Sequence, residues 1–139
     1  MTKDDYFMKI AEIVKLRSGC QRRQVGSVYV VDDRIAATGY NQSASGLKHC
    51  SEVGCTIVDG HCIRSIHAEQ NGIFNATRAG QSLKDATVYI TTFPCLKCLM
   101  SLRNVGVRKI VFGELYNYSE AEKSIFEELK NYFVMVQYE

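Results

Sequence analysis

Three side chains with metal-binding chemistry stand in two short motifs of this sequence. His67 begins the run His-Ala-Glu, and Cys95 and Cys98 lie in the run Pro-Cys-Leu-Lys-Cys. One imidazole and two thiolates suit Zn²⁺ and leave its fourth position open, as in catalytic zinc sites. Because the two cysteines are three residues apart, one helical turn can point both sulfur atoms at the same ion. We therefore predict a catalytic zinc centre.

Glu69 supplies the proton-transfer group that an open zinc site needs. It follows His67 by two residues and, with the proline before Cys95, completes the pattern H-x-E … P-C-x-x-C. This pattern is the signature of zinc deaminases that act on nucleobases, in which the glutamate is the general acid and base. A C-x-x-C pair with one upstream histidine also occurs in structural zinc sites, but those are closed by a fourth ligand, and none stands nearby in the sequence. The pattern predicts a hydrolase that removes an exocyclic amine from a base.

The sequence predicts a succession of helices and strands along the chain. Apolar residues at three- and four-residue spacing predict helices, and β-branched runs predict strands. This order predicts an α/β protein, a three-layer α/β/α fold with a mixed five-stranded sheet, and one zinc-dependent deaminase domain over 1–139. The expected helices cover 4–18, 65–80, 95–105 and 119–132, and the expected strands cover 25–31, 35–40, 86–92, 107–112 and 133–138.

The helix that carries His67 and Glu69 is preceded by a long segment of a different kind. Ser65 is the expected N-cap of that helix. Residues 41–64 are rich in glycine and serine and show no sustained period, so they predict a loop. Loops of this length are usually functional or held in place by something.

Composition narrows the class of protein. The 139 residues, 46% hydrophobic and 23% charged, are typical of a globular chain. The net charge is only +2 and the 17 lysines and arginines are scattered, which disfavours a protein that lives on nucleic acid. The first residues lack the basic and apolar runs of a signal peptide, and no stretch approaches about 18 apolar residues. We therefore expect a cytoplasmic protein with no stable nucleic-acid or membrane partner.

The chain resembles the cytidine deaminase superfamily, and within it the deoxycytidylate (dCMP) deaminases and the related late-competence proteins. Free-cytidine deaminases usually carry cysteine where His67 stands, and tRNA adenosine deaminases generally lack the asparagine found at Asn71. The resemblance implies a cytidine deaminase-like fold and the hydrolysis of dCMP to dUMP and ammonia, which feeds dTMP synthesis. It covers about residues 18–113 and is carried by QVGSV from 24, GYN from 39, HAEQN from 67, and VYIT followed by FPC from 88.

The resemblance also implies where the substrate lies. Asn41 is expected to contact the sugar, since an amide both donates and accepts hydrogen bonds. The alternative is that Asn41 only closes a turn after its strand. The backbone at Ala68 and the strand end at Thr92 and Phe93 are expected to bound the base.

Cationic side chains are the natural partners of a substrate phosphate. The alternative for each is a solvated surface charge. Arg78 lies, by resemblance, at a subunit contact and is not assigned to substrate. The expected phosphate contacts are Arg22, Arg23 or Gln24, assisted by Lys48, Tyr116 or Tyr118.

Four further cysteines make a complete tetrahedral zinc set. Three of them lie in the long loop, and a metal there would hold that loop in one shape. Adjacent histidines are alternative ligands, and ordinary buried free thiols are the other interpretation. We predict a second, structural zinc. Its candidate ligands are Cys20, Cys50, Cys55 and Cys62, with His49 and His61 as alternates.

Regulation and assembly follow from the resemblance alone. It implies a homo-oligomer, in particular a hexamer, and allosteric control by Mg²⁺-dCTP and dTTP. Gln42 and Ser45 depart from the glycines common in the loop that binds the effectors, which weakens the prediction of control.

Two other functions compete with the prediction. One is a cytidine or adenosine deaminase acting on a DNA or RNA strand, which needs a basic channel and stacking aromatics. The small net charge and the absence of tryptophan disfavour it. The other is a non-catalytic nucleotide-binding accessory protein. Glu69 disfavours that one, because a binding module has no use for a proton shuttle.

Overall fold

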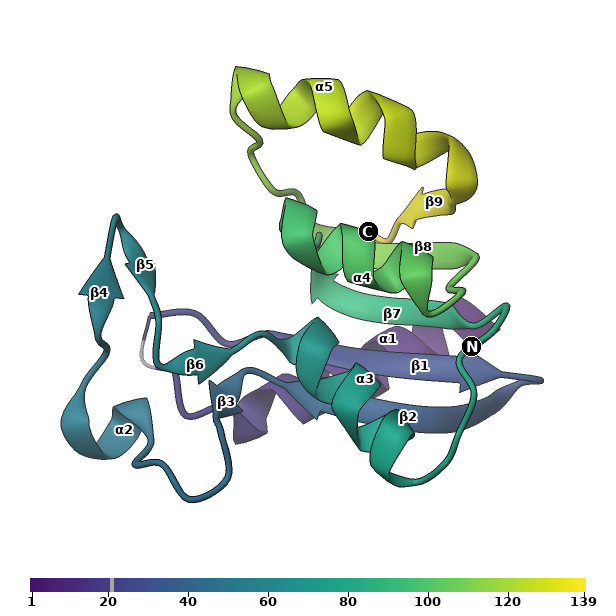
Figure 1. Cartoon of the computed structure of the whole chain (residues 1–139). Helices are drawn as coiled ribbons and strands as arrows, with labels where there is room; N and C mark the ends of the chain where they lie inside the picture. The colour runs from purple at the N-terminus through teal and green to yellow at the C-terminus, as the bar shows by residue number, and fades with distance from the viewer. Residues whose placement is uncertain (21) are drawn as a thin grey trace.

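The computed structural model describes residues 1–20 and 22–139 and confirms the predicted three-layer α/β/α architecture around a mixed sheet (Figure 1). The pairs β2–β1 and β1–β7 are antiparallel, whereas β7–β8 and β8–β9 are parallel. The five strands lie in the order β2-β1-β7-β8-β9. They are β1 (Gly26–Val31), β2 (Arg34–Tyr40), β7 (Thr87–Thr92), β8 (Lys109–Glu114) and β9 (Val134–Gln137).

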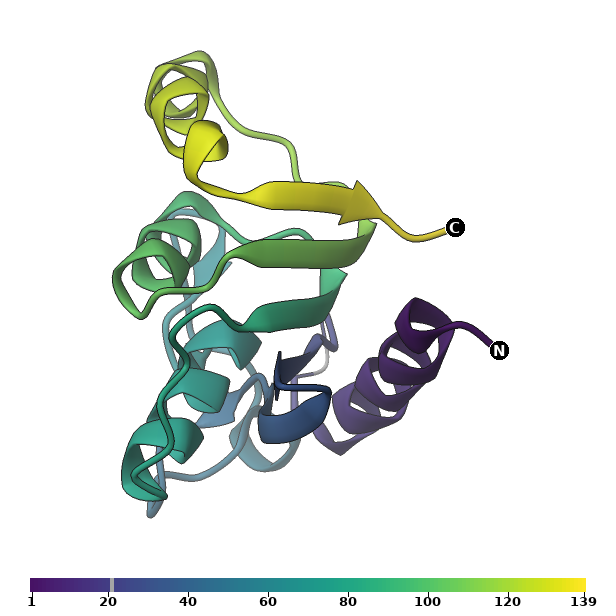
Figure 2. The ribbon, with the colours of Figure 1, turned by 90° about the vertical axis from the view of Figure 1, so that its right-hand side faces the viewer.

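Helices cover both faces of this sheet. Figure 2 shows α1 on one face and α3, α4 and α5 on the other. Successive strand residues point to opposite faces, so Val28 packs on the α1 side and Tyr29 on the α3 side. The helices are α1 (Lys3–Val14), continued by η1 (Lys15–Arg17); α3 (Ala68–Arg78); α4 (Leu96–Asn104); and α5 (Glu120–Leu129), continued by η2 (Lys130–Tyr132).

The long segment over 41–64 is less irregular than predicted. It contains four short elements, and a fifth, β6, follows it directly; the strands form two small sheets, β3 with β6 and β4 with β5, apart from the main sheet. Strands of two residues are too short to show a period in the sequence, which is why they were not predicted. They are β3 (Gln42–Ser43), α2 (Cys50–Val53), β4 (Ile57–Val58), β5 (His61–Cys62) and β6 (Ser65–Ile66).

The predicted cap at Ser65 is wrong. Ser65 belongs to β6, where it pairs with Ser43 of β3. The helix α3 begins two residues later than that cap requires, with His67 in an extended conformation at the N-cap position. The strand pairing, a contact between distant residues, holds Ser65 out of the helix.

Close packing holds α3 against the sheet where glycines face each other. A Cβ atom on Gly39 would lie 2.3 Å from the backbone nitrogen of Gly72, so neither position has room for a side chain. At the start of α3, the Ser27 hydroxyl donates to the Ala68 carbonyl at 2.9 Å. The Tyr29 hydroxyl donates to the Glu69 carbonyl at 2.7 Å. These contacts fix the first turn of α3 on β1.

In the described residues, no helix combines the length and apolarity needed to cross a membrane.

Candidate active site

The first turns of α3 and α4 bring the predicted zinc ligands together. His67 is the N-cap of α3, Cys95 is the N-cap of α4, and Cys98 follows within the first turn of α4. The partial positive charge at a helix N-terminus favours thiolates there. The Nδ1 atom of His67 lies 3.5 Å from the Cys95 sulfur and 3.4 Å from the Cys98 sulfur.

These separations fit a tetrahedral ion. A zinc ion about 2.0–2.1 Å from nitrogen and about 2.3 Å from sulfur places two such ligands about 3.5 Å apart. The three ligand atoms also lie within 4.8 Å of one another. The donor set and its spacing therefore suit Zn²⁺, bound through Nδ1 of the histidine, without any side chain having to move far.

The Cys95 thiol is prepared to lose its proton, whereas the hydrogen bond with Cys95, and then burial, raise the pKa of the Cys98 thiol. The pKa of the Cys95 thiol is lowered to about 4, mainly by the hydrogen bond with Cys98 and further by the hydrogen bond with His67. The hydrogen bond with Cys95 raises the pKa of His67. Metal ligation needs thiolates and a neutral imidazole, so binding of a cation releases the remaining protons.

Glu69 lies beside these ligands and is 4% exposed. Burial raises the pKa of its carboxyl group to about 7. A carboxyl group with a pKa near the working pH can both accept and donate a proton. Its backbone is held by Tyr29, as described above, so the side chain starts from a fixed position.

A cavity of about 430 Å³ opens over Glu69, His67 and Cys95, while Cys98, the third metal-binding side chain, is buried behind its wall. Most of the substrate contacts expected from the sequence line it. The described wall of the cavity does not include Gln24, Lys48 or Tyr118. The expected residues that do line it are Arg22, Arg23, Asn41, Ala68, Thr92, Phe93 and Tyr116.

Two of the three expected residues outside the cavity, Gln24 and Tyr118, have other partners. The Gln24 side chain donates to the Ser18 carbonyl at 3.3 Å. The Tyr118 hydroxyl donates to the Pro94 carbonyl at 2.6 Å and so supports the turn before Cys95. These two contacts hold the Gln24 and Tyr118 side chains outside the cavity wall.

Several lining residues were not predicted as substrate contacts. Val25 and Gly60 carry no chemical signal in the sequence, and Ser65 was predicted only as a helix cap. His61 and Cys62 had been considered only as metal ligands. All five line the cavity. The position of Gly60, His61 and Cys62 beside the cavity depends on the fold of the segment over 41–64, which no local pattern revealed.

Asn41 makes the contacts of the turn interpretation, and its predicted contact with the sugar stays a prediction. Its Nδ2 donates to the Arg23 carbonyl at 2.7 Å and its Oδ1 accepts from the Val25 amide at 2.9 Å. The side chain therefore holds the strand entry in place. It also lines the cavity, and a primary amide keeps one further donor and one further acceptor site.

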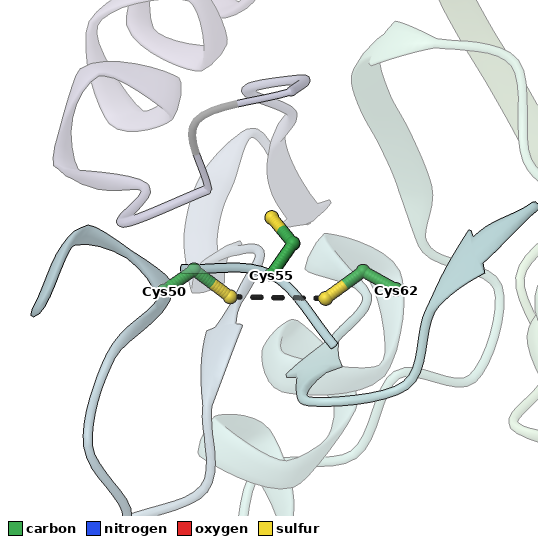
Figure 3. Close-up of side chains that lie close together, drawn as sticks. All are labelled: Cys50, Cys55 and Cys62. Carbon is green, nitrogen blue, oxygen red and sulfur yellow. Dashed lines mark hydrogen bonds between the residues drawn. The ribbon is translucent and has the colours of Figure 1, made fainter. Parts of the chain in front are cut away.

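Three of the four remaining cysteines form a second cluster (Figure 3). The sulfur atoms of Cys50, Cys55 and Cys62 lie within 4.8 Å of one another. Cys20 does not belong to this group in the described structure; its sulfur instead accepts a hydrogen bond from the Arg23 amide at 3.4 Å. His49 and His61 are not part of it either.

The fold and the ligand geometry define a zinc-binding deaminase domain. Residues 1–114 match the family described as "Cytidine and deoxycytidylate deaminase zinc-binding region", and the chain belongs to this family. It is similar to ComE operon protein 2 of Bacillus subtilis, with 37% identity over 125 residues, 90% of this chain and 66% of that protein. It is also similar to the deoxycytidylate deaminase of Saccharomyces cerevisiae, with 37% identity over 142 residues, 96% of this chain and 44% of that protein.

A solved structure with a similar fold is the dCMP deaminase of cyanophage S-TIM5 in complex with dCMP and dUMP. The TM-score is 0.82 at 26% identity, and the match covers 96% of this chain and 95% of that one. By contrast, this chain spans less than two thirds of the length of the two relatives above.

Proposed function

We propose that this chain is a zinc-dependent deaminase that hydrolyses dCMP to dUMP and ammonia. One observation carries the proposal: a buried carboxyl group, Glu69, shares one cavity with His67 and Cys95 of the His-Cys-Cys metal set and with Arg22 and Arg23. A base with an exocyclic amine suits the inner end, and a phosphate suits the rim. The similar cyanophage enzyme was solved with dCMP and dUMP, which supports the same substrate here.

His67, Cys95 and Cys98 are the proposed zinc ligands. When bound there, zinc acts as a Lewis acid and makes a water molecule nucleophilic near neutral pH. Glu69 accepts a proton from the attacking water and donates one to the ring nitrogen of the base. It then takes the second proton of the same water, now on the hydroxyl group added to the base, and gives it to the amine; the C–N bond breaks, the carbonyl of dUMP forms and ammonia leaves. Because Glu69 is buried, its proton stays with the reactants between these transfers.

The rest of the cavity orients the nucleotide. Phe93 and the backbone of Ala68 bound the base, and Asn41 offers its free amide positions to the sugar. Arg22 and Arg23 are the proposed phosphate contacts. Arg23 lies 3.7 Å from Glu114, both side chains being exposed, and such surface ion pairs exchange partners at little cost.

We also propose that residues 1–139 act as one deaminase domain and that a second zinc binds Cys50, Cys55 and Cys62. A homo-hexamer with Arg78 at a subunit contact, a cytoplasmic location, and control by Mg²⁺-dCTP and dTTP stay predictions. The proposed product, dUMP, would feed the synthesis of dTMP.

The experiment is to measure ammonia release from dCMP, deoxycytidine, dCTP and a cytosine-containing oligonucleotide, with zinc counted per chain. We expect turnover of dCMP in particular, with two zinc ions per chain. Turnover of the oligonucleotide but not of dCMP would instead identify a polynucleotide deaminase. Nucleotide binding with no ammonia from any substrate would identify an accessory binding protein.

A further inference from the structure

The three-cysteine cluster and the nucleotide cavity share one structural element, the hairpin formed by β4 and β5. Cys62 on β5 contributes its sulfur atom to the cluster. The same residue, with its neighbours Gly60 and His61, lines the cavity. Whatever fixes the cluster therefore also fixes part of the cavity wall.

The cluster has the dimensions of a metal site. The Cys50 and Cys62 sulfur atoms lie 3.7 Å apart, with no disulfide between them. Two thiolates bound to one tetrahedral zinc ion, each about 2.3 Å from it, lie about 3.8 Å apart. The three thiols come from the start of α2, the connection after it and β5 (Figure 3). An ion bound to all three would tie these segments together, and a solvent molecule can complete the tetrahedron.

Within the described residues, few contacts other than the cysteine cluster hold the hairpin. Its strands are two residues long, and they pair with each other through Ile57–Cys62 and Val58–His61. Ile57 is 47% exposed and Val58 is 49% exposed, so they bury little apolar surface. An isolated two-stranded hairpin is marginally stable in water. The cysteine cluster at its base is thus the main candidate for its anchor.

The hairpin also holds a group of the proposed phosphate end. The Nη1 atom of Arg22 donates to the carbonyl of Gly60, in the hairpin turn, at 3.2 Å. Movement of the turn would therefore displace a cation at the rim as well as the wall formed by His61 and Cys62.

We propose that a thiophilic divalent ion, with Zn²⁺ the best fit, binds Cys50, Cys55 and Cys62 and holds the hairpin as a wall of the nucleotide cavity. The ion and the nucleotide then bind cooperatively, and each strengthens the binding of the other by the same factor. The second zinc and the identity of the nucleotide both rest on the proposed function. The coupling itself does not require turnover.

The test compares wild type with Cys55→Ser, because Cys55 belongs to the cluster but does not line the described cavity. Zinc per chain and the affinity for the product dUMP, by calorimetry, are the two measurements. We expect zinc to fall from two per chain to one, and dUMP to bind about tenfold more weakly. Cys55→His restores a ligand and should restore both values. Val58→Ala, a change in the same hairpin away from the thiols, should alter neither.

Unchanged dUMP affinity in a Cys55→Ser protein that has lost one zinc overturns the coupling. Wild type that holds only one zinc, or that does not bind dUMP, also overturns it. If Cys55→Ser does not fold, wild-type protein loaded with one and with two equivalents of zinc replaces it, and equal dUMP affinities then count against the proposal. Wild type that binds dUMP cooperatively with its second zinc, yet releases no ammonia from dCMP, supports the coupling and contradicts the proposed function.

Discussion

Gly72, where α3 meets the sheet, gives a prediction whose sign depends on tertiary structure. By helix propensity alone, Gly72→Ala in the middle of α3 should stabilise the protein by about 1 kcal/mol. In the folded chain, however, the new Cβ atom would lie 2.3 Å from Cε2 of Tyr29 and 3.0 Å from Oγ of Ser27. Carbon atoms pack comfortably about 3.5–4.0 Å apart, so the ring would have to move by roughly 1 Å.

The Tyr29 ring has no free space into which it can move. Tyr29 is 0% exposed, and its hydroxyl is bonded to the Glu69 carbonyl. Forcing an extra carbon into a filled core costs about 1–3 kcal/mol, and loss of the hydrogen bond costs about 1 kcal/mol more. After the gain in helix propensity, we expect Gly72→Ala to lower the free energy of unfolding by about 2 kcal/mol. The melting temperature should fall by roughly 6 °C.

Urea unfolding followed by circular dichroism, at equal zinc loading, measures this change. Tyr29→Leu removes the ring atoms that the new carbon meets, so adding Gly72→Ala to that variant should cost much less than adding it to wild type. A Gly72→Ala protein as stable as wild type, or more stable, would refute the steric reasoning, and so would strict additivity of the two substitutions.

Three further predictions concern proton transfer, the support of α3 and acid stability. Glu69→Gln should keep its zinc and lose at least about 100-fold in kcat; turnover at the wild-type rate contradicts its role. Tyr29→Phe should lower the free energy of unfolding by about 1 kcal/mol in urea, and an unchanged value would show that its bond to the Glu69 carbonyl contributes nothing. Hydrogen bonds from Tyr138, and then from Thr2, lower the pKa of Asp5 to about 2 from 3.8. Their stabilisation is present above that ordinary value and lost as the pH falls toward 2, so Asp5→Asn should flatten the pH dependence of urea unfolding in this range.

The sequence by itself determined the order of the main helices and strands and the choice of the His67, Cys95 and Cys98 set with Glu69. Apolar periodicity is a property of neighbouring residues, so α1, β1, β2 and the later elements could be predicted from it. A two-residue offset and a C-x-x-C spacing are local as well. Because the first turn of a helix places Cys95 beside Cys98, and the start of another places His67 beside Glu69, the two motifs predict most of the arrangement of the ligands.

Only the tertiary structure decided how the long segment over 41–64 folds and which thiols meet. Cys20 carries the same chemistry as Cys50, Cys55 and Cys62, yet only the latter three come together. Likewise Arg23 lines the cavity while its neighbour Gln24 does not. These outcomes depend on pairings such as β3 with β6, and on hydrogen bonds between separate segments, such as that from Asn41 to the Arg23 carbonyl. Contacts of that kind have no local signature, because the free energy that selects them arises only when the distant segments pack together.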